Sequence, residues 1–162
     1  IRPIEPTDSF DELTDLLHRA YAPLGEAGME FVASHQDVEV TKKRAGWGSC
    51  HVAVLDGKLV GTVTIYGPMP DSRVELYRRD DTFHFGQFCV DPDLQNNGLG
   101  DRLLRHAEDF ARKNGGSFLA FDTSERADRL ISWYSKRGYA SVGTTDWEAT
   151  NYLSILFSKS LI

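Results

Sequence analysis

The stretch from Phe88 to Gly100 reads FCVDPDLQNNGLG and joins an apolar, strand-like segment to an amphipathic helix. Asp91-Pro92 ends the strand, and the helix follows directly after Gly98. Helix N-termini expose unpaired N–H groups and the positive end of the helix dipole. A polar loop at such a place is suited to hold a pyrophosphate, and glycines let the anion approach the backbone closely.

Other phosphate-binding motifs do not fit this spacing. The segment lacks the Gly-x-x-x-x-Gly-Lys-Ser/Thr pattern of a P-loop, and the dinucleotide fingerprint fails because its third glycine position is Leu103. The plainer interpretation remains open: a strand-to-helix turn whose glycines only relieve backbone strain.

On both sides of this segment, hydrophobic periodicity predicts alternating strands and helices. The expected strands are 1–6, 51–55, 59–66, 83–90, 117–122, 139–144 and 152–158. The expected helices begin after Asp8 or Ser9, run from about Met29 toward Arg44, cover 99–111, and end at Gly138. Residues 67–81 read as a surface loop. This order predicts a mixed sheet covered by helices.

Composition narrows the function classes. The chain has 162 residues, 41% hydrophobic and 26% charged, which is typical of one globular domain. Its formal charge of −6 argues against a nucleic-acid surface and favours a basic or cationic substrate. No apolar run is long enough to span a membrane, so we expect a cytoplasmic protein. The two cysteines and the scattered histidines predict neither a disulfide framework nor a metal site.

Two motifs resemble the GNAT superfamily of N-acetyltransferases. Val90-x-Pro92 followed by Gln95-x-x-Gly98-x-Gly100 resembles its acetyl-coenzyme A signature, and Trp133–Tyr139, WYSKRGY, is similar to its aromatic-Tyr-x-Lys-x-Gly-aromatic segment. The resemblance spans the chain from Ile1 to about Leu161. It implies one acetyltransferase domain over residues 1–162 with an α/β (α+β) fold, a mixed, mostly antiparallel seven-stranded sheet flanked by about four helices.

The resemblance also implies acetyl-coenzyme A as the acyl donor, with no metal. In the family, the loop amides hold the pyrophosphate and the preceding strand pairs with the pantetheine arm. Carried over, the binding positions are Phe88, Cys89, Val90, Gln95, Asn96, Asn97, Gly98, Leu99, Gly100 and Asp101. A backbone N–H near Val90 is the expected oxyanion donor. The family's Asn early in the next helix is absent here, and Thr123, Ser124 or Asp128 stand in for it; of these we select Ser124.

Tyr134 occupies the family's general-acid position. A phenol with a pKa of about 10 is protonated at pH 7 and can donate a proton to a departing thiolate. The alternative is that Tyr134 belongs to the core, packed with Leu130 and Ile131 against the sheet.

The residues offer several candidates for the general base. Many family members carry a Glu four residues before the position of Val90, and here that residue is Gly86. His84 lies on the same strand face as Gly86 by alternation, and an ordinary imidazole pKa of about 6.5 suits a base. A surface role for His84, a bound water as the base, and Glu75 or Asp122 as reserve bases all remain open. Gln87 and Cys89 are expected on the opposite face unless a bulge interrupts the strand.

The predicted activity is acetyl transfer to a primary amine that attacks the thioester directly. Acceptor-binding residues are expected at the helix junction around 21–31, in the loop 67–83 and in the last hairpin. The selected positions are Phe31, Tyr66, Glu75, Tyr77, Asn151 and Tyr152. Polyamines, amino acids, antibiotics and protein N-termini all remain open as acceptors. The alternative is a catalytically weak acyl-coenzyme A-binding module, suggested by the missing strand carboxylate. We expect no nucleic acid or membrane partner and, by family analogy, a homodimer.

Overall fold

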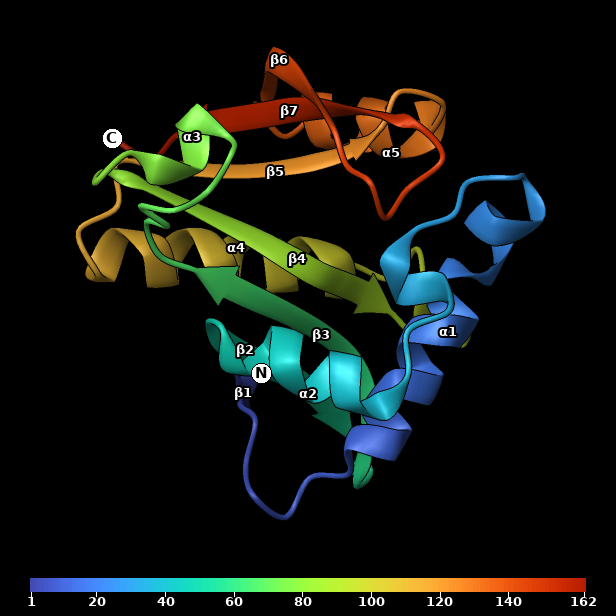
Figure 1. Ribbon diagram of the computed structural model, residues 1–162. Coiled ribbons are helices and arrows are strands. Elements are labelled where there is room, and N and C mark those ends of the chain that lie inside the picture. The colour runs from blue at the N-terminus through green and yellow to red at the C-terminus, as the bar shows by residue number, and fades with distance from the viewer.

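The computed structural model describes residues 1–162, and its centre is a seven-stranded sheet (Figure 1). The strands are β1 (Arg2–Pro3), β2 (Ser49–Leu55), β3 (Lys58–Tyr66), β4 (Thr82–Val90), β5 (Phe118–Ser124), β6 (Ala140–Asp146) and β7 (Leu153–Ser160). Their spatial order is β1-β2-β3-β4-β5-β7-β6. Every neighbouring pair is antiparallel except β4 and β5, which are parallel. The expected mixed, mostly antiparallel sheet is confirmed.

Helices cover both faces of this sheet. They are α1 (Phe10–Glu26), α2 (Val38–Gly46), α3 (Glu75–Arg78), α4 (Leu99–Lys113) and α5 (Asp128–Ser135), with 3₁₀ turns η1 (Val32–Ser34) and η2 (Pro92–Leu94). The buried side of α1 packs with β2 and β3 in one apolar cluster, and α4 and α5 pack on the other face in a larger one. Figure 1 shows α4 behind the sheet and α2 in front of it.

Of the two predicted caps of the first helix, Ser9 is the one used: its side chain accepts a hydrogen bond from the Glu12 N–H at the start of α1. The next helix boundary differs from the sequence prediction. The second helix begins only at Val38, where Asp37 caps it by accepting from the Val40 N–H. The loop at 67–81 also contains the short helix α3. None of the helices combines the length and the apolar character that crossing a bilayer requires.

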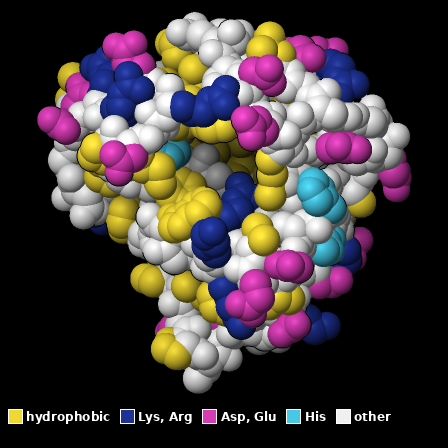
Figure 2. Space-filling model, in the orientation of Figure 1, with side chains coloured by type: hydrophobic (Ala, Val, Ile, Leu, Met, Phe, Trp, Pro, Cys, Tyr) yellow, Lys and Arg dark blue, Asp and Glu magenta, His cyan; other side chains and the backbone are white.

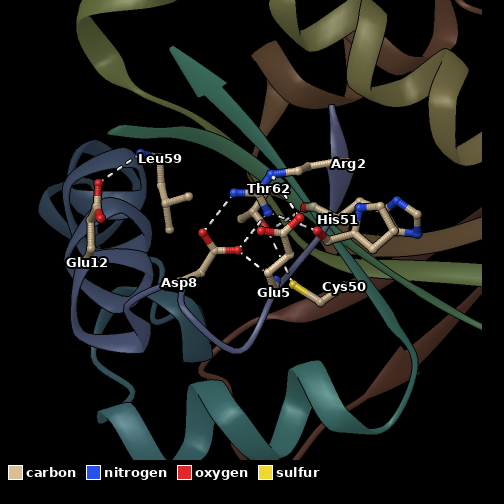
Figure 3. Close-up of polar contacts among 9 residues, drawn as sticks. Arg2, Glu5, Asp8, Glu12, Cys50, His51, Leu59 and Thr62 are labelled. Atoms are coloured by element: carbon tan, nitrogen blue, oxygen red, sulfur yellow. Dashed lines mark hydrogen bonds and ion pairs between the residues drawn. The ribbon is translucent and has the colours of Figure 1, made fainter. Parts of the chain in front are cut away.

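Side-chain contacts hold the short strand β1 at the edge of the sheet (Figure 3). Arg2 donates two hydrogen bonds to Asp8, at 2.7 and 2.9 Å, and Asp8 also accepts from the Glu5 N–H. The Glu12 carboxylate accepts from the Leu59 N–H at the start of β3. These bonds connect the first ten residues and α1 to the sheet.

The parallel pair β4–β5 separates partway along its length. Residue pairing runs only from Thr82 opposite Phe118 to His84 opposite Ala120, after which the strands diverge, as Figure 1 shows. The rest of β4 therefore presents backbone groups that β5 does not bond. A β-bulge lies in this free part, where the pairing of β4 with β3 shifts register and Gln87 takes a φ of 47°.

Candidate active site

A cleft of about 1570 Å³ opens where β4 and β5 diverge. Its wall includes residues of β4, the start of α4, one face of α5, and segments from α1, α2 and the β6–β7 loop. Figure 2 shows a hollow in this face of the molecule, with hydrophobic side chains in and around it and Lys and Arg side chains at its edge. Acidic side chains also lie beside the hollow, so the cleft joins an apolar interior to a rim that carries both charges.

The N-terminus of α4 forms one end of the cleft. Gly98 precedes the helix with φ 88°, which favours glycine, and no side chain caps the helix there. The first intrahelical bond runs from the Arg102 N–H to the Gly98 carbonyl, so the three preceding N–H groups have no partner. With the dipole behind them, these donors suit a pyrophosphate, and binding of that group here stays a prediction.

Arg137 connects the two sequence motifs at this end. Its guanidinium donates two hydrogen bonds to the Asp101 carboxylate, at 2.6 and 2.9 Å, and lies 3.7 Å from the centre of the Trp133 ring. The bonds from Arg137 lower the pKa of Asp101. The ion pair offsets a negative charge on the first turn of α4. Arg137 lies inside the quoted motif, but sequence reasoning assigned it no role.

Most of the predicted coenzyme-binding residues line this cleft. They are Phe88, Cys89, Val90, Gln95, Asn96, Gly98, Gly100 and Asp101. Asn97 and Leu99 do not; they border a separate small pocket, next to Val54 and Val60. Ser124 does not line the cleft either, because it is fully buried and its Oγ accepts from the Arg126 N–H. Thr123 does line it, and its buried Oγ1 has no partner.

Tyr134 lies on α5 at the wall of the cleft, only 5% exposed. Its ring packs on Phe121, with centroids 4.0 Å apart, and meets Trp133 edge-on at 4.9 Å. Burial raises its pKa well above the ordinary value of 10, so the phenol is protonated throughout the neutral range. The ring therefore belongs to the core, as the alternative expected, and the side chain also borders the cleft; its role as general acid stays a prediction.

His84 also borders the cleft, but its environment is not the one expected from sequence. It is 7% exposed and lies between the rings of Tyr77 and Tyr66, with centroids at 4.0 and 5.0 Å. Its Nδ1 has no hydrogen-bond partner. Burial lowers its pKa to about 4. The expectation of an ordinary pKa near 6.5 was wrong for this reason, and so was the alternative of a surface residue.

The bulge changes which way the β4 side chains point. Gln87, expected on the face opposite His84, donates to the Thr64 Oγ1 and accepts from Gln36, so it lies on the same side as Gly86. Cys89 packs with the α1 cluster, while Phe88 and Val90 pack on the α4 face. The bulge adds one residue to β4. After it, the side chains alternate again between the two faces of the sheet, but each lies on the face opposite to the one predicted.

Some of the predicted reserve bases and acceptor-binding residues line the cleft, and others lie outside it. Asp122 lines the cleft, but its two oxygens accept from the Tyr77 hydroxyl and the Trp147 indole N–H, both at 2.8 Å. Glu75 is exposed on α3, outside the cleft. Asn151 is exposed too and bonds to backbone atoms of Glu30 and Gly28. The predicted residues that line the cleft are Phe31, Tyr66, Tyr77 and Tyr152.

Arg44 is a residue of the cleft that sequence reasoning missed. It projects from α2, is half-buried, and donates to the Gln36 Oε1 at 2.6 Å. Its Nη2 lies 3.6 Å from the point where a Cβ on Gly86 would stand. No local pattern marks this residue, because its neighbours in space are distant in sequence. Elsewhere, no three His, Cys, Asp or Glu side chains come together in a way that suits a metal ion.

The chain matches known acetyltransferases along most of its length. The family model described as "Acetyltransferase (GNAT) family" matches residues 10–139. The S-(2-succino)cysteine N-acetyltransferase of Bacillus subtilis (strain 168) is 27% identical over 93% of this chain and 90% of its own length. The S-alkylcysteine N-acetyltransferase of the same organism is 25% identical over 82% of this chain and 74% of its own.

A solved structure supports the fold. An acetyltransferase of Bacillus subtilis, crystallised in complex with CoA, superimposes with a TM-score of 0.69 at 18% sequence identity and covers 99% of both chains. The match to the family model extends from α1 to the end of the second motif and thus includes β4, α4 and Tyr134. The chain therefore belongs to the acetyltransferase (GNAT) family and is an acetyl-coenzyme A-dependent N-acetyltransferase.

Proposed function

We propose that the chain transfers the acetyl group of acetyl-coenzyme A to the α-amino group of a small amino acid, by direct attack of the amine. One observation carries the proposal: the unpaired N–H groups of α4, the free part of β4 and the Tyr134 phenol border the same cleft. Two relatives are named for N-acetylation of substituted cysteines, and a third, 32% identical over 61% of this chain, is named N-acetylaspartate synthetase.

The coenzyme would be held by backbone groups of the chain. Acetyl-coenzyme A supplies an activated thioester when bound. The N–H groups at the start of α4 suit its pyrophosphate, and the free edge of β4 from Phe88 to Val90 suits its pantetheine arm. An N–H of this same edge, near Val90, would donate to the oxygen that gains negative charge during transfer. Fixed backbone donors of this kind stabilise charge without having to reorganise.

Tyr134 would donate a proton to the departing thiolate. Its raised pKa keeps the phenol protonated at any working pH but also makes it a weaker acid, so the phenol acts chiefly by donating a hydrogen bond to the charge that develops on sulfur. A coenzyme thiol has a pKa of about 8.5, so the thiolate accepts a hydrogen bond readily as charge develops on sulfur. Phe121 and Trp133 fix the ring, which limits the motion of the hydroxyl.

His84 would receive the amine as a hydrogen-bond acceptor. Its pKa of about 4 keeps the imidazole neutral at pH 7, and a neutral imidazole has one acceptor nitrogen. Such a group orients the neutral amine but is too weak a base to hold the ammonium proton. We therefore assign final proton removal to water in the open cleft, with His84 as the orienting group.

The alternative function is a catalytically weak acyl-coenzyme A-binding module. Gly86 favours it, because the strand lacks the carboxylate that many family members use. The two proposals differ in amine-stimulated thiol release, which can be measured in the steady state. S-benzyl-L-cysteine, L-aspartate and spermidine form a suitable panel. Release stimulated by an amino acid supports the transferase; tight acetyl-coenzyme A binding without stimulation by any amine supports the module.

A further inference from the structure

Arg44 is a half-buried cation in the cleft that has no carboxylate partner within the chain. The ion pairs of the structure involve Arg2, Arg19, Arg79, Arg112, Arg126, Arg137, Lys42 and Lys159, but not Arg44. Burying part of a guanidinium costs free energy unless an anion compensates it. The position of Arg44 on the cleft wall leaves its charge available to a ligand.

A neutral hydrogen-bond network holds this guanidinium in place. Gln36 Oε1 accepts from Arg44 Nη1 at 2.6 Å, while Gln36 Nε2 donates to Thr41 Oγ1 and to Gln87 Oε1, both at 2.7 Å. Gln87 Nε2 in turn donates to Thr64 Oγ1 at 3.3 Å. Gln36 and Gln87 are each 2% exposed, so the chain of amides is fixed. It orients Arg44 without neutralising its charge.

Gly86 leaves open the space in front of Arg44. A Cβ at Gly86 would stand 3.6 Å from Arg44 Nη2, 3.6 Å from the Tyr66 hydroxyl and 3.4 Å from the Tyr66 ring. These distances are close to ordinary van der Waals contacts, so a Cβ would fit at position 86. Because the residue is glycine, no side chain occupies that place. Two hydrogen-bond donors, Nη2 and the Tyr66 hydroxyl, therefore flank a space that the protein leaves empty of side-chain atoms.

We propose that Arg44, oriented by Gln36 and opposite the bare position at Gly86, binds the carboxylate of the acceptor and makes the enzyme specific for amines that carry one. A guanidinium offers a carboxylate two parallel N–H donors, which gives both strength and geometry. The inference rests on the proposed function, because it places the acceptor in the same cleft. It makes Arg44 a specificity-determining residue and Gln36 a positioning residue.

This assignment reverses the sequence-based expectation of a cationic substrate. The chain as a whole carries a charge of −6, and the cleft wall includes Lys43 and Arg73 as well as Asp71 and Asp122, but Arg44 itself has no carboxylate partner. A polyamine would place like charges next to Arg44. An amino acid zwitterion presents a carboxylate to Arg44, and its amine lies one carbon away from that carboxylate.

A pair of probes tests the anchor directly. S-benzyl-L-cysteine and S-benzylcysteamine have the same amine and the same side chain, but only the first has a carboxylate. In the wild type we expect the acid to have the higher kcat/KM. Arg44→Gln should raise KM for the acid about 10- to 100-fold and change KM for the amine about twofold at most. The KM for acetyl-coenzyme A should not change.

A matched pair of variants at Gly86 separates charge from size. Gly86→Glu places a carboxylate beside Arg44, whereas Gly86→Gln places a neutral group of the same size there. Glu should remove the preference for the acid, and Gln should keep more of it. Gln36→Glu places a carboxylate against Arg44 from the other side and should lower the ratio of kcat/KM for the acid to kcat/KM for the amine, a change of selectivity that simple unfolding does not produce.

Binding of the product analogue N-acetyl-S-benzyl-L-cysteine, measured by calorimetry in the presence of coenzyme A, separates this inference from the proposed function. Binding that weakens in Arg44→Gln supports the anchor even if no amine is acetylated, in which case only the proposed function fails. Equal kcat/KM for the two amines in the wild type overturns the anchor. So does acid preference that persists in Arg44→Gln, or a failure of the analogue to bind the wild type.

Discussion

The imidazole of His84 lies face to face with the ring of Tyr77, with centroids 4.0 Å apart and planes 9° apart. Burial of this imidazole lowers its pKa to about 4, so the histidine is neutral at pH 7. His51, 4% exposed and 2.8 Å from His106 between their ring nitrogens, has its pKa lowered to about 4 as well, by burial first and by the charge of His106 second. Both histidines bind a proton more readily when the chain is unfolded.

We therefore predict a loss of stability in mild acid. An unfolded histidine has a pKa of about 6.5, so the stabilisation is complete above that pH and is lost as the pH falls toward 4. For the deeply buried His84, a depression of this size corresponds to about 3 kcal/mol. His84→Phe should flatten the decline in the free energy of unfolding between pH 6.5 and 4, measured by urea titration. The exposed His35→Gln should leave the decline as in the wild type.

Replacing Tyr134 by Phe should lower kcat while leaving the coenzyme affinity unchanged. The Phe ring keeps the contacts with Phe121 and Trp133, so only the proton donor is lost. General acids contribute about 100-fold or more to such reactions. Single-turnover kinetics and calorimetry with coenzyme A measure the two quantities separately. If kcat is unaltered, Tyr134 has no part in the chemistry.

Tyr139→Phe provides the matched control for that variant. Tyr139 is also a buried tyrosine of the same core, 3% exposed, but its hydroxyl donates to the Glu108 carboxylate away from the cleft. We expect this variant to lose stability and to keep kcat. A similar drop in kcat for both variants would mean that core packing, rather than proton donation, explains the effect.

The ion pair between Arg137 and Asp101 should affect coenzyme binding through charge. Arg137→Gln leaves the Asp101 carboxylate without its partner on the first turn of α4, next to the expected pyrophosphate position. We predict that KM for acetyl-coenzyme A rises about fivefold, corresponding to about 1 kcal/mol for a partly exposed pair. The rise should shrink at high salt, because ions screen the repulsion.

The double variant Arg137→Gln with Asp101→Asn tests this explanation. Removing both charges should restore most of the coenzyme affinity, because the repulsive carboxylate is gone. If the double variant is weaker than Arg137→Gln alone, the Asp101 carboxylate assists binding. The contact of Arg137 with Trp133 is lost in both variants and therefore cancels in the comparison.

Local signals made much of the fold predictable. Asp56-Gly57 marks the turn between β2 and β3, and the polar loop before Gly98 separates β4 from α4, so each boundary is encoded by the residues at that place. The second helix was placed too early, because Met29 and Phe31 are apolar for a different reason: they pack with Tyr152 in a loop cluster. The spacing of apolar residues indicates which positions are buried, and it does not distinguish a helix from a buried loop.

The site was predictable only where one segment contains it. The Gln95–Gly100 loop and Tyr134 lie within short motifs, so their places follow from the chain itself. The orientation of Gln87 depends on a one-residue bulge, which sequence alternation does not reveal. Arg44 meets Gly86, and Arg137 meets Asp101, only because the sheet brings distant segments together. The low pKa of His84 likewise follows from burial between two tyrosines.

The pair formed by Arg2 and Asp8 should stabilise the edge strand in a pH-dependent way. Hydrogen bonds from Arg2 are the largest cause of the lowered pKa of Asp8, and the Glu5 N–H adds to it. A carboxylate with a depressed pKa contributes stability above its unfolded pKa of about 3.9 and loses it as the pH falls. Asp8→Asn should therefore cost about 1 kcal/mol at pH 7 and progressively less as the pH falls below about 3.9, measured by denaturant titration. Asp15→Asn removes an exposed partner of Arg19 and should cost little at either pH; an equal cost for both variants would show that the contact between Arg2 and Asp8 has no special role.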